Sequence, residues 1–310
     1  MNSFRTNQNG ETPQIKPLPL NATLEALVAV LVTFVPVTIY FSLMQAYDST
    51  NHVFRQVFIE QDPRLSMPSV EKTHVPNMML ALLSCLVPCV GLLISSGFVL
   101  ARTRSLRHVQ VYTFIVWTCF AMCLLLNSAG TNSLKILYGA PRPSFFAICN
   151  YHGYRDALSS NNFTEYFELT HFGRFGDIAN CRDKSDINDA FMSFPSGHSS
   201  LMFAGATYMS LVMFMFRQFH KLMYVLAIFV SGGVMVLSTW VTYTRVADYK
   251  HNTQDVLAGT ILGFVLGFSV FQFARDLLIR CELSPDVFAT PDTKTGQRAE
   301  NDINSMDLNL

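Results

Sequence analysis

Histidines, cations and one carboxylate stand in three short clusters along this chain, each at the end of an apolar segment. The third cluster contains Arg245, His251 and Asp255. If a helix begins near His251, the spacing of four residues places the imidazole and the carboxylate on one face. A carboxylate that accepts the Nδ1 hydrogen of an imidazole fixes its tautomer and makes Nε2 a better nucleophile. We therefore predict that His251 is a nucleophile, that Asp255 orients it, and that Arg245 binds the anion it attacks.

The second cluster reads Phe-Pro-Ser-Gly-His-Ser and enters an apolar segment. Pro195 and Ser196 suit a helix start, so the N–H groups of Ser196, Gly197 and His198 should point at a bound anion, helped by the helix dipole. Gly197 permits close backbone approach. His198 is then placed to protonate a leaving oxygen as a general acid.

The first cluster supplies two more cations, Lys135 and Arg142, with Pro143 after them. A guanidinium binds two oxygens at once, whereas an ammonium acts as a point charge. Three cations together with a helix N-terminus match a phosphate dianion, whose charge persists through phosphoryl transfer. The sequence offers no acidic cluster for Mg²⁺, so we expect chemistry that needs neither metal nor cofactor.

The elements that must position these clusters are membrane helices. The 310 residues include 22 Lys plus Arg and 22 Asp plus Glu, and only 14% are charged, against about 25% in a soluble domain. This composition excludes a soluble enzyme, a disordered chain and a nucleic-acid binder. Six windows lack Asp, Glu, Lys and Arg, and each is long enough for the roughly 20 residues that cross a bilayer. We predict an all-α bundle of six transmembrane helices, with windows at 26–47, 73–101, 108–134, 190–216, 222–244 and 256–274.

The cations of the short loops predict the orientation of this bundle. Arginines and lysines follow the second, fourth and sixth segments, so those loops should be cytoplasmic, at Arg102, Arg104, Arg107, Arg217, Lys221, Arg275 and Arg280. The three chemical clusters then lie on the lumenal or extracellular side. We divide the chain into a cytoplasmic tail over 1–23, a transmembrane domain over 24–277 with a lumenal loop at 135–194, and a disordered cytoplasmic tail over 278–310.

Two features of the long loop are consistent with a lumenal location. Asn162 begins an Asn-Phe-Thr acceptor sequence for N-glycosylation, a modification made on the lumenal side. Cys149 and Cys181 share the loop, and we expect a disulfide between them in an oxidising compartment. A second acceptor sequence at Asn21 abuts the first segment on the cytoplasmic side, and we expect it to be empty.

A glycine repeat marks the last apolar segment. Gly259, Gly263 and Gly267 recur every four residues and should give that helix a smooth face for close packing.

Taken singly, the charged clusters have ordinary explanations, since interfacial Lys and Arg reach toward lipid headgroups and Ser commonly caps a helix. Taken together, they resemble the three motifs of the type 2 phosphatidic acid phosphatase superfamily, over about residues 24–275. The matching runs are Lys135-x6-Arg142-Pro143, Pro195-Ser196-Gly197-His198 and Arg245-x5-His251-x3-Asp255.

The run Thr-Arg-Val-Ala-Asp-Tyr-Lys-His, which ends at His251, is similar to the lipid phosphate phosphatases within that superfamily. The resemblance implies a helical-bundle active site shared with vanadium haloperoxidases, a phosphohistidine at His251, and His198 as the donor to the leaving alcohol. Thr244 stands where the family usually has Ser, which keeps the hydroxyl.

The function expected from these features is metal-independent hydrolysis of phosphatidate and related lipid phosphate monoesters such as lysophosphatidate, sphingosine 1-phosphate and ceramide 1-phosphate. Alternatives are hydrolysis of polyprenyl diphosphates or sugar phosphates, a non-catalytic signalling relative, a transporter and a channel. The expected partners are the lipid substrate and the membrane, either plasma membrane or endomembrane, with no nucleic acid. The chain is also compatible with a homo-oligomer.

Overall fold

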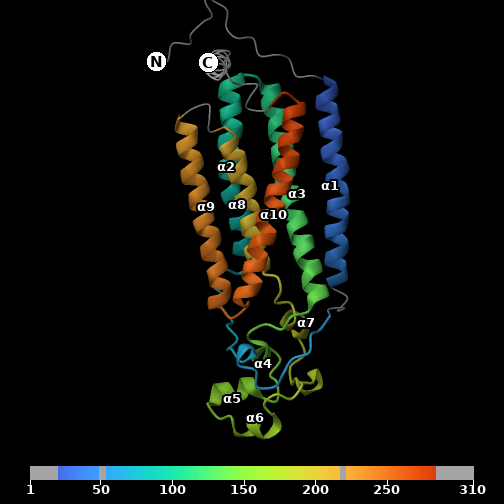
Figure 1. Cartoon of the computed structure of the whole chain (residues 1–310), viewed down its shortest axis with the longest axis vertical. Helices are drawn as coiled ribbons and strands as arrows, with labels where there is room; N and C mark the ends of the chain where they lie inside the picture. The colour runs from blue at the N-terminus through green and yellow to red at the C-terminus, as the bar shows by residue number, and fades with distance from the viewer. Residues whose placement is uncertain (1–19, 49–53, 217–220, 284–310) are drawn as a thin grey trace, which may run out of the picture.

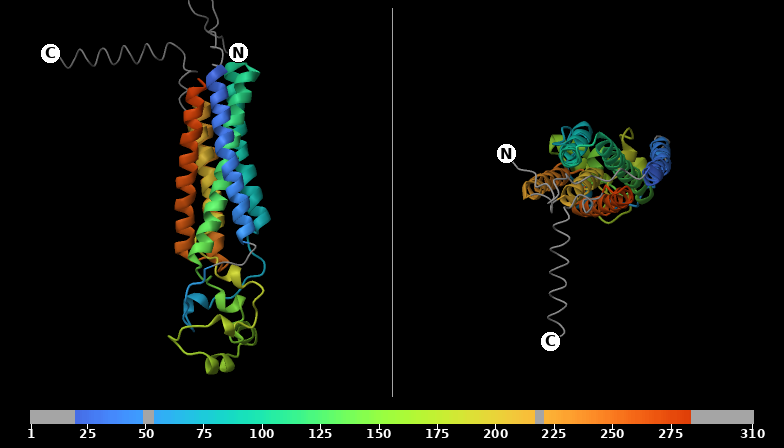
Figure 2. Two further views of the ribbon diagram at one scale, coloured as in Figure 1. Left: turned by 90° about the vertical axis from the view of Figure 1, so that its right-hand side faces the viewer. Right: turned by 90° about the horizontal axis from the view of Figure 1, so that it is seen from above.

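A computed structural model describes residues 20–48, 54–216 and 221–283, and in this part of the chain the protein is helical, with two isolated β-bridges and no strand. The expectation of an all-α fold is confirmed. Six long helices lie side by side as a bundle (Figures 1 and 2): α1 (Leu20–Asp48), α2 (Asn77–Thr103), α3 (Leu106–Tyr138), α8 (Gly197–Met215), α9 (Lys221–Ala247) and α10 (Thr253–Arg280).

Five of these helices are long and apolar enough to cross a membrane, namely α1, α2, α3, α9 and α10. The sixth, α8, is shorter and packs against α2, α3, α9 and α10. Small and hydroxylated residues share its buried surface with bulky apolar ones, and include Ser199, Ser200, Gly205, Thr207 and Ser210. Most of this helix is buried because other helices cover it on several sides.

Close backbone packing joins α8 to α10 through the glycine repeat. A Cβ added to Gly259 would collide with the carbonyl oxygen of Ser196, and one on Gly263 with that of Ser200. A Cβ added to Gly267 would lie 2.7 Å from the carbonyl oxygen of Ala204. The expected smooth face is confirmed, and it brings the start of α10 to the start of α8.

A folded cap covers one end of the bundle. It is formed by residues 54–76 and 139–195, whereas α1 begins and α10 ends at the opposite end (Figures 1 and 2). The cap contains short helices at Pro63–Leu65, Phe145–Ile148 (α4), Tyr154–Ser160 (α5), Thr164–Leu169 (α6), Ile178–Asn180 and Ile187–Ala190 (α7). Its core is aromatic, with the Phe58 ring 4.7 Å from that of Phe145 and 5.5 Å from that of Tyr151.

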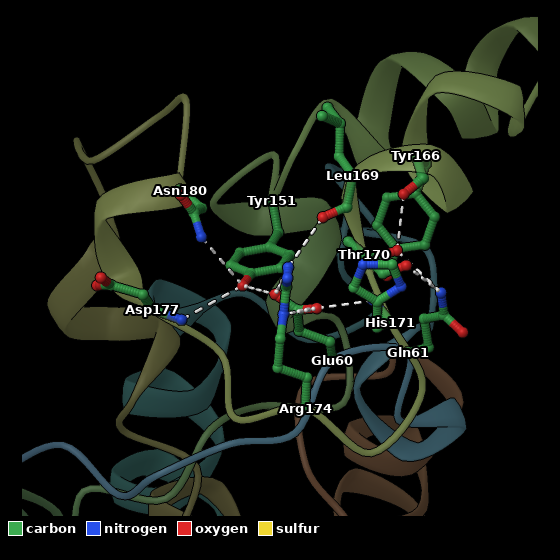
Figure 3. A network of polar contacts seen from close by, with 10 residues as sticks. All are labelled: Glu60, Gln61, Tyr151, Tyr166, Leu169, Thr170, His171, Arg174, Asp177 and Asn180. Carbon is green, nitrogen blue, oxygen red and sulfur yellow. Dashed lines mark hydrogen bonds and ion pairs between the residues drawn. The ribbon is translucent and has the colours of Figure 1, made fainter.

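The two segments of the cap are joined by the buried carboxylate of Glu60 (Figure 3). It accepts from Nε of Arg174 at 2.8 Å, from the Tyr151 hydroxyl at 2.7 Å and from the His171 N–H at 2.8 Å. Burial acts to raise the pKa of Glu60, but these hydrogen bonds and the Arg174 charge hold it below its ordinary value. The carboxylate therefore stays ionised and paired, as burial of a charge requires.

A disulfide joins Cys149 to Cys181 inside the cap, with 5.1 Å between their Cα atoms. The cap is thus held by an aromatic core, a paired carboxylate and a covalent bond.

Arg217 and most of both expected tails lie outside the described residues.

We predict that Gly263→Ala lowers the thermal stability of the purified protein. Alanine normally stabilises an exposed helix position relative to glycine, but here its methyl would meet the Ser200 carbonyl and the Ala204 nitrogen. Overpacking of this kind costs about 1–3 kcal/mol. Thermal unfolding in detergent measures the change, and Gly232→Ala is the matched control because nothing lies within 4 Å of its added methyl. Equal midpoints for the two variants would contradict the packing argument.

Candidate active site

The three clusters meet where the bundle joins the cap. The C-terminal ends of α3 and α9 and the N-terminal ends of α8 and α10 all lie there (Figure 1). Lys135, Arg142 and Arg245 are near enough to act electrostatically on His198, and Lys135 and Arg142 act likewise on His251. The sequence clusters are therefore one site.

His251 lies in the turn between α9 and α10 and is buried. Its Nδ1 is 2.7 Å from the carbonyl oxygen of Ser193. Because a carbonyl only accepts hydrogen bonds, this contact places the proton on Nδ1 and leaves the lone pair on Nε2. Burial, and then the nearby charges of Arg142 and Lys135, lower the pKa of His251 well below its ordinary value. The imidazole is therefore neutral, as a nucleophile must be.

Asp255 does not make the direct hydrogen bond to His251 that the sequence predicts. Its Oδ2 lies 3.9 Å from Nδ1 of His251 and instead accepts from the Ser193 hydroxyl at 2.6 Å and the Asn252 N–H at 2.8 Å. The reason is that α10 begins at Thr253, so Asp255 closes a capping box with Asn252. His251 precedes the helix and does not share its face.

His198 lies in the first turn of α8 between two groups of opposite character. Its Nε2 is 3.1 Å from the carbonyl oxygen of Val75 and 3.3 Å from Nη1 of Arg245. The carbonyl requires a proton on Nε2, whereas the guanidinium requires a lone pair there. The imidazolium can donate from Nε2 to Val75, and the neutral ring with its proton on Nδ1 can accept from Arg245 at the same atom. Such surroundings suit a group that gives and takes a proton at Nε2.

Arg245 is held in place by its neighbours at the end of α9. Its Nη2 donates to Asp248 Oδ2 at 2.9 Å and to the Thr244 hydroxyl at 3.0 Å. Asp248 is also buried, and it accepts from the His74 N–H at 3.0 Å and contacts the His74 ring. Asp248 therefore connects the guanidinium to the segment that enters α2 and carries Val75.

The N-terminus of α8 departs from expectation at Ser196. Its N–H is not free, because it donates to the carbonyl oxygen of Asp255 at 2.9 Å. The close approach of α10 causes this. Its hydroxyl oxygen caps the helix by accepting from the N–H and the hydroxyl of Ser199. Gly197 and His198 are the first two helical residues, whose N–H groups have no acceptor within the helix.

Lys135 and Arg142 reach the site from the end of α3 and the loop after it. Lys135 Nζ lies 3.7 Å from the position that a Cβ would take on Gly197, so the ammonium borders the α8 N-terminus. The Arg142 guanidinium is mostly buried and donates to Asp189 of α7, through Nε to the carbonyl oxygen at 2.7 Å and through Nη2 to Oδ1 at 2.5 Å. The cap thus orients one of the three cations.

The arrangement combines a neutral histidine with a free lone pair, a second histidine that exchanges protons, and three cations beside a helix N-terminus. These are the parts needed to bind a phosphate, attack it and protonate the leaving group. Among the described residues, no group of three or more His, Cys, Asp or Glu side chains is placed to hold a metal ion.

Sequence reasoning missed Ser193, Asp248, Asp189 and the Val75 carbonyl. Asp248 follows Arg245 by three residues, a spacing that on a helix would have suggested an ion pair. No sequence signal identifies the Val75 carbonyl, because it acts through the main chain and belongs to a segment 123 residues before His198.

Comparison with known proteins decides the family. The model of the PAP2 superfamily matches residues 116–278, which is more than half of the chain. This chain belongs to the PAP2 superfamily. The matched region runs from the middle of α3 to the last turns of α10 and contains every motif residue named above.

Curated relatives of this PAP2 protein include phosphatases. A probable diacylglycerol pyrophosphate phosphatase 1 of Schizosaccharomyces pombe is 26% identical over 224 residues, 71% of this chain and 72% of that protein. A putative phosphatidate phosphatase of Drosophila melanogaster is 25% identical over 276 residues, 81% of this chain and 67% of that protein. Diacylglycerol pyrophosphate phosphatase 1 of Saccharomyces cerevisiae is 28% identical over 216 residues, 69% and 68% of the two chains. No solved structure matches this chain significantly. The chain is a PAP2 phosphatase.

We predict that Asp248→Asn lowers kcat/KM for phosphate release at least about tenfold, because it removes the charge that holds the buried Arg245 guanidinium, and interactions of this kind contribute about 1.5–3 kcal/mol. His74→Ala should cost less than about threefold, since the His74 N–H stays and its ring is mostly exposed. Steady-state kinetics of both purified variants measures the difference. Wild-type kinetics in Asp248→Asn would show that Arg245 needs no such partner.

Proposed function

We propose that this PAP2 phosphatase hydrolyses phosphatidate and related lipid phosphate monoesters through a phosphohistidine intermediate and without a metal ion. The observation that carries the proposal is the contact between His251 Nδ1 and the Ser193 carbonyl, at 2.7 Å. It leaves the lone pair of Nε2 unprotonated in a site that three cations border. The phosphatidate and lipid pyrophosphate phosphatases among its relatives support the substrate class.

In the first step the lone pair of His251 Nε2 forms a bond to phosphorus while the ester P–O bond breaks. The electron pair of that bond goes to the lipid oxygen, which takes the Nε2 proton of a His198 protonated on both ring nitrogens and leaves as an alcohol. His198 keeps its Nδ1 proton and becomes neutral. Lys135, Arg142 and Arg245 bind the phosphoryl oxygens, whose negative charge persists throughout.

In the second step a water molecule attacks phosphorus and gives its proton to His198. The N–P bond breaks, its electron pair returns to His251 Nε2, and inorganic phosphate leaves. The reaction ends with both histidines in their starting states, so the proposed cycle needs no further reactant.

We propose further that α8 is the sixth membrane span and that the cap faces the lumen or the outside. Supporting this orientation, Arg102 in the last turn of α2, Arg104 after it and Arg107 in the first turn of α3 lie where these helices join, at the end of the bundle away from the cap. The cap instead contains the Cys149–Cys181 disulfide and the Asn162 acceptor sequence. The catalytic domain in this proposal spans residues 24–277, with both tails in the cytoplasm.

A second candidate is hydrolysis of lipid diphosphates at the same site. Two relatives are named as diacylglycerol pyrophosphate phosphatases. Lys250 lies near enough to Arg142 and Arg245 for their charges to act on it. A second phosphate would give this ammonium a partner. The alternative of a non-catalytic signalling relative is disfavoured by the presence of both histidines and all three cations.

The first test separates the two histidines by the leaving group. A lipid alkoxide needs protonation as it leaves, whereas a nitrophenolate does not. His198→Ala should therefore lose about 10²–10⁴-fold in kcat/KM on phosphatidate, but far less on nitrophenyl phosphate. His251→Ala should lose both activities and the trapped phosphoenzyme, because the attack step is common to the two substrates. Phosphate release in EDTA measures all four combinations.

Equal losses on both substrates in His198→Ala would void the assignment of the acid. A phosphoenzyme at the wild-type level in His251→Ala would void the nucleophile. Absence of phosphate release by wild-type protein in EDTA, restored by a divalent cation, would overturn the metal-independent mechanism.

The second test concerns sidedness. Asn162 is exposed, and its Oδ1 accepts from the Thr164 hydroxyl at 2.9 Å, so the acceptor side chain is accessible. If the cap faces the lumen, protein made in a eukaryotic membrane should carry a glycan that a glycosidase removes, and Asn162→Gln should abolish the gel shift. Asn21→Gln is the matched control and should change nothing. A glycan at Asn21 would invert the proposed topology.

A further inference from the structure

We propose that Ser193 is a positioning residue through which Asp255 acts on the nucleophile His251. The inference rests on the proposed phosphohistidine chemistry and deepens it. It assigns the orienting effect of Asp255 on His251 to two hydrogen bonds, one made by the Ser193 hydroxyl and one by the Ser193 carbonyl, which we call the relay. Ser193 lies in the segment between α7 and α8 and is fully buried.

The relay follows from three distances. The Ser193 hydroxyl donates to Asp255 Oδ2 at 2.6 Å, and the Ser193 carbonyl oxygen accepts from His251 Nδ1 at 2.7 Å. The direct separation between Asp255 Oδ2 and His251 Nδ1 is 3.9 Å, which is too long for a hydrogen bond. Among the described contacts, the hydrogen bonds that link His251 to the Asp255 carboxylate are both made by Ser193.

Both ends of the relay are anchored. Asp255 is fixed in the first turn of α10, where its Oδ2 also accepts from the Asn252 N–H at 2.8 Å. The Ser193 N–H donates to the carbonyl oxygen of Ala140 at 3.1 Å. A hydroxyl bound to a carboxylate makes a strong, charge-assisted hydrogen bond. The hydroxyl of Ser193 therefore determines where its own carbonyl points, and the carbonyl determines the angle of the imidazole.

The relay holds the ring but transfers no proton. When Nε2 bonds to phosphorus, the Nδ1 proton stays in place and the ring becomes positively charged. The electron pair of the broken ester bond leaves with the lipid oxygen, which takes its proton from His198. The fixed Ser193 carbonyl then faces a stronger donor, so its contribution is larger in the phosphoenzyme than in the free enzyme.

A double-mutant cycle tests the relay. Ser193→Ala keeps the carbonyl and removes only the tether, so kcat for phosphatidate should fall about tenfold, the value of one such hydrogen bond. KM should change less than about twofold, because the three phosphate-binding cations are untouched. In an Asp255→Ala background, adding Ser193→Ala should cost less than about twofold. Removal of the Asp255 cap from α10 affects both variants in that background equally, so its effect cancels.

Ser238→Ala is the matched control. Ser238 is equally buried, and its hydroxyl donates to the Val234 carbonyl oxygen within α9 at 2.8 Å. This variant should keep wild-type kcat. The rate of phosphoenzyme formation in a single turnover supplies the readout that a merely structural role would leave unchanged, and thermal unfolding reports any loss of stability separately.

Two results would overturn the relay while leaving the proposed function intact. One is wild-type kcat in Ser193→Ala. The other is additive losses, in which Ser193→Ala costs the same factor with and without Asp255. If the wild-type protein released no phosphate from any lipid phosphate, the proposed function itself would fail, which distinguishes the two ideas.

Discussion

Backbone contact between α8 and α10 is the constraint on which the active site depends. Three glycines let α10 lie against the carbonyl groups of α8, and the Ser196 N–H closes the contact by donating to the Asp255 carbonyl at 2.9 Å. A methyl group at Gly259 or Gly263 would overlap the carbonyl oxygen of Ser196 or Ser200, so the helices could not keep this approach. Dense packing of this kind responds to small volume changes, so catalytic geometry and bundle stability share one cause.

The cap adds a second layer of control over the same residues. It orients the Arg142 guanidinium through Asp189 and supplies the Val75 carbonyl to His198. The ends of the long helices thus position the histidines, while the cap orients one cation and supplies an acceptor to His198. Because the cap supplies these contacts, the apolar segments alone, without the connections at 54–76 and 139–195, would not make a complete site.

Much of this arrangement was predictable from the sequence. Charge-free windows located the long helices, and the motif spacing identified the histidines and the cations that the structure brings together. The direct hydrogen bond expected between Asp255 and His251 is replaced by a separation of 3.9 Å, because the four-residue spacing assumes that both residues are helical, whereas α10 begins at Thr253. The contacts of the Ser193 and Val75 carbonyl groups could not be found, since every residue possesses such a group. The absence of charge also did not distinguish α8, which other helices cover on several sides, from the helices at the edge of the bundle.

The Glu60 carboxylate bears on the order in which the molecule is assembled. Its partner Arg174 lies 114 residues later in the chain, after α2 and α3. A growing polypeptide therefore makes Glu60 long before the charge that neutralises it, and the cap stays open until the second segment has emerged. Helices α8, α9 and α10 are synthesised later still. Residues His251 and Asp255 are thus made only after both segments of the cap.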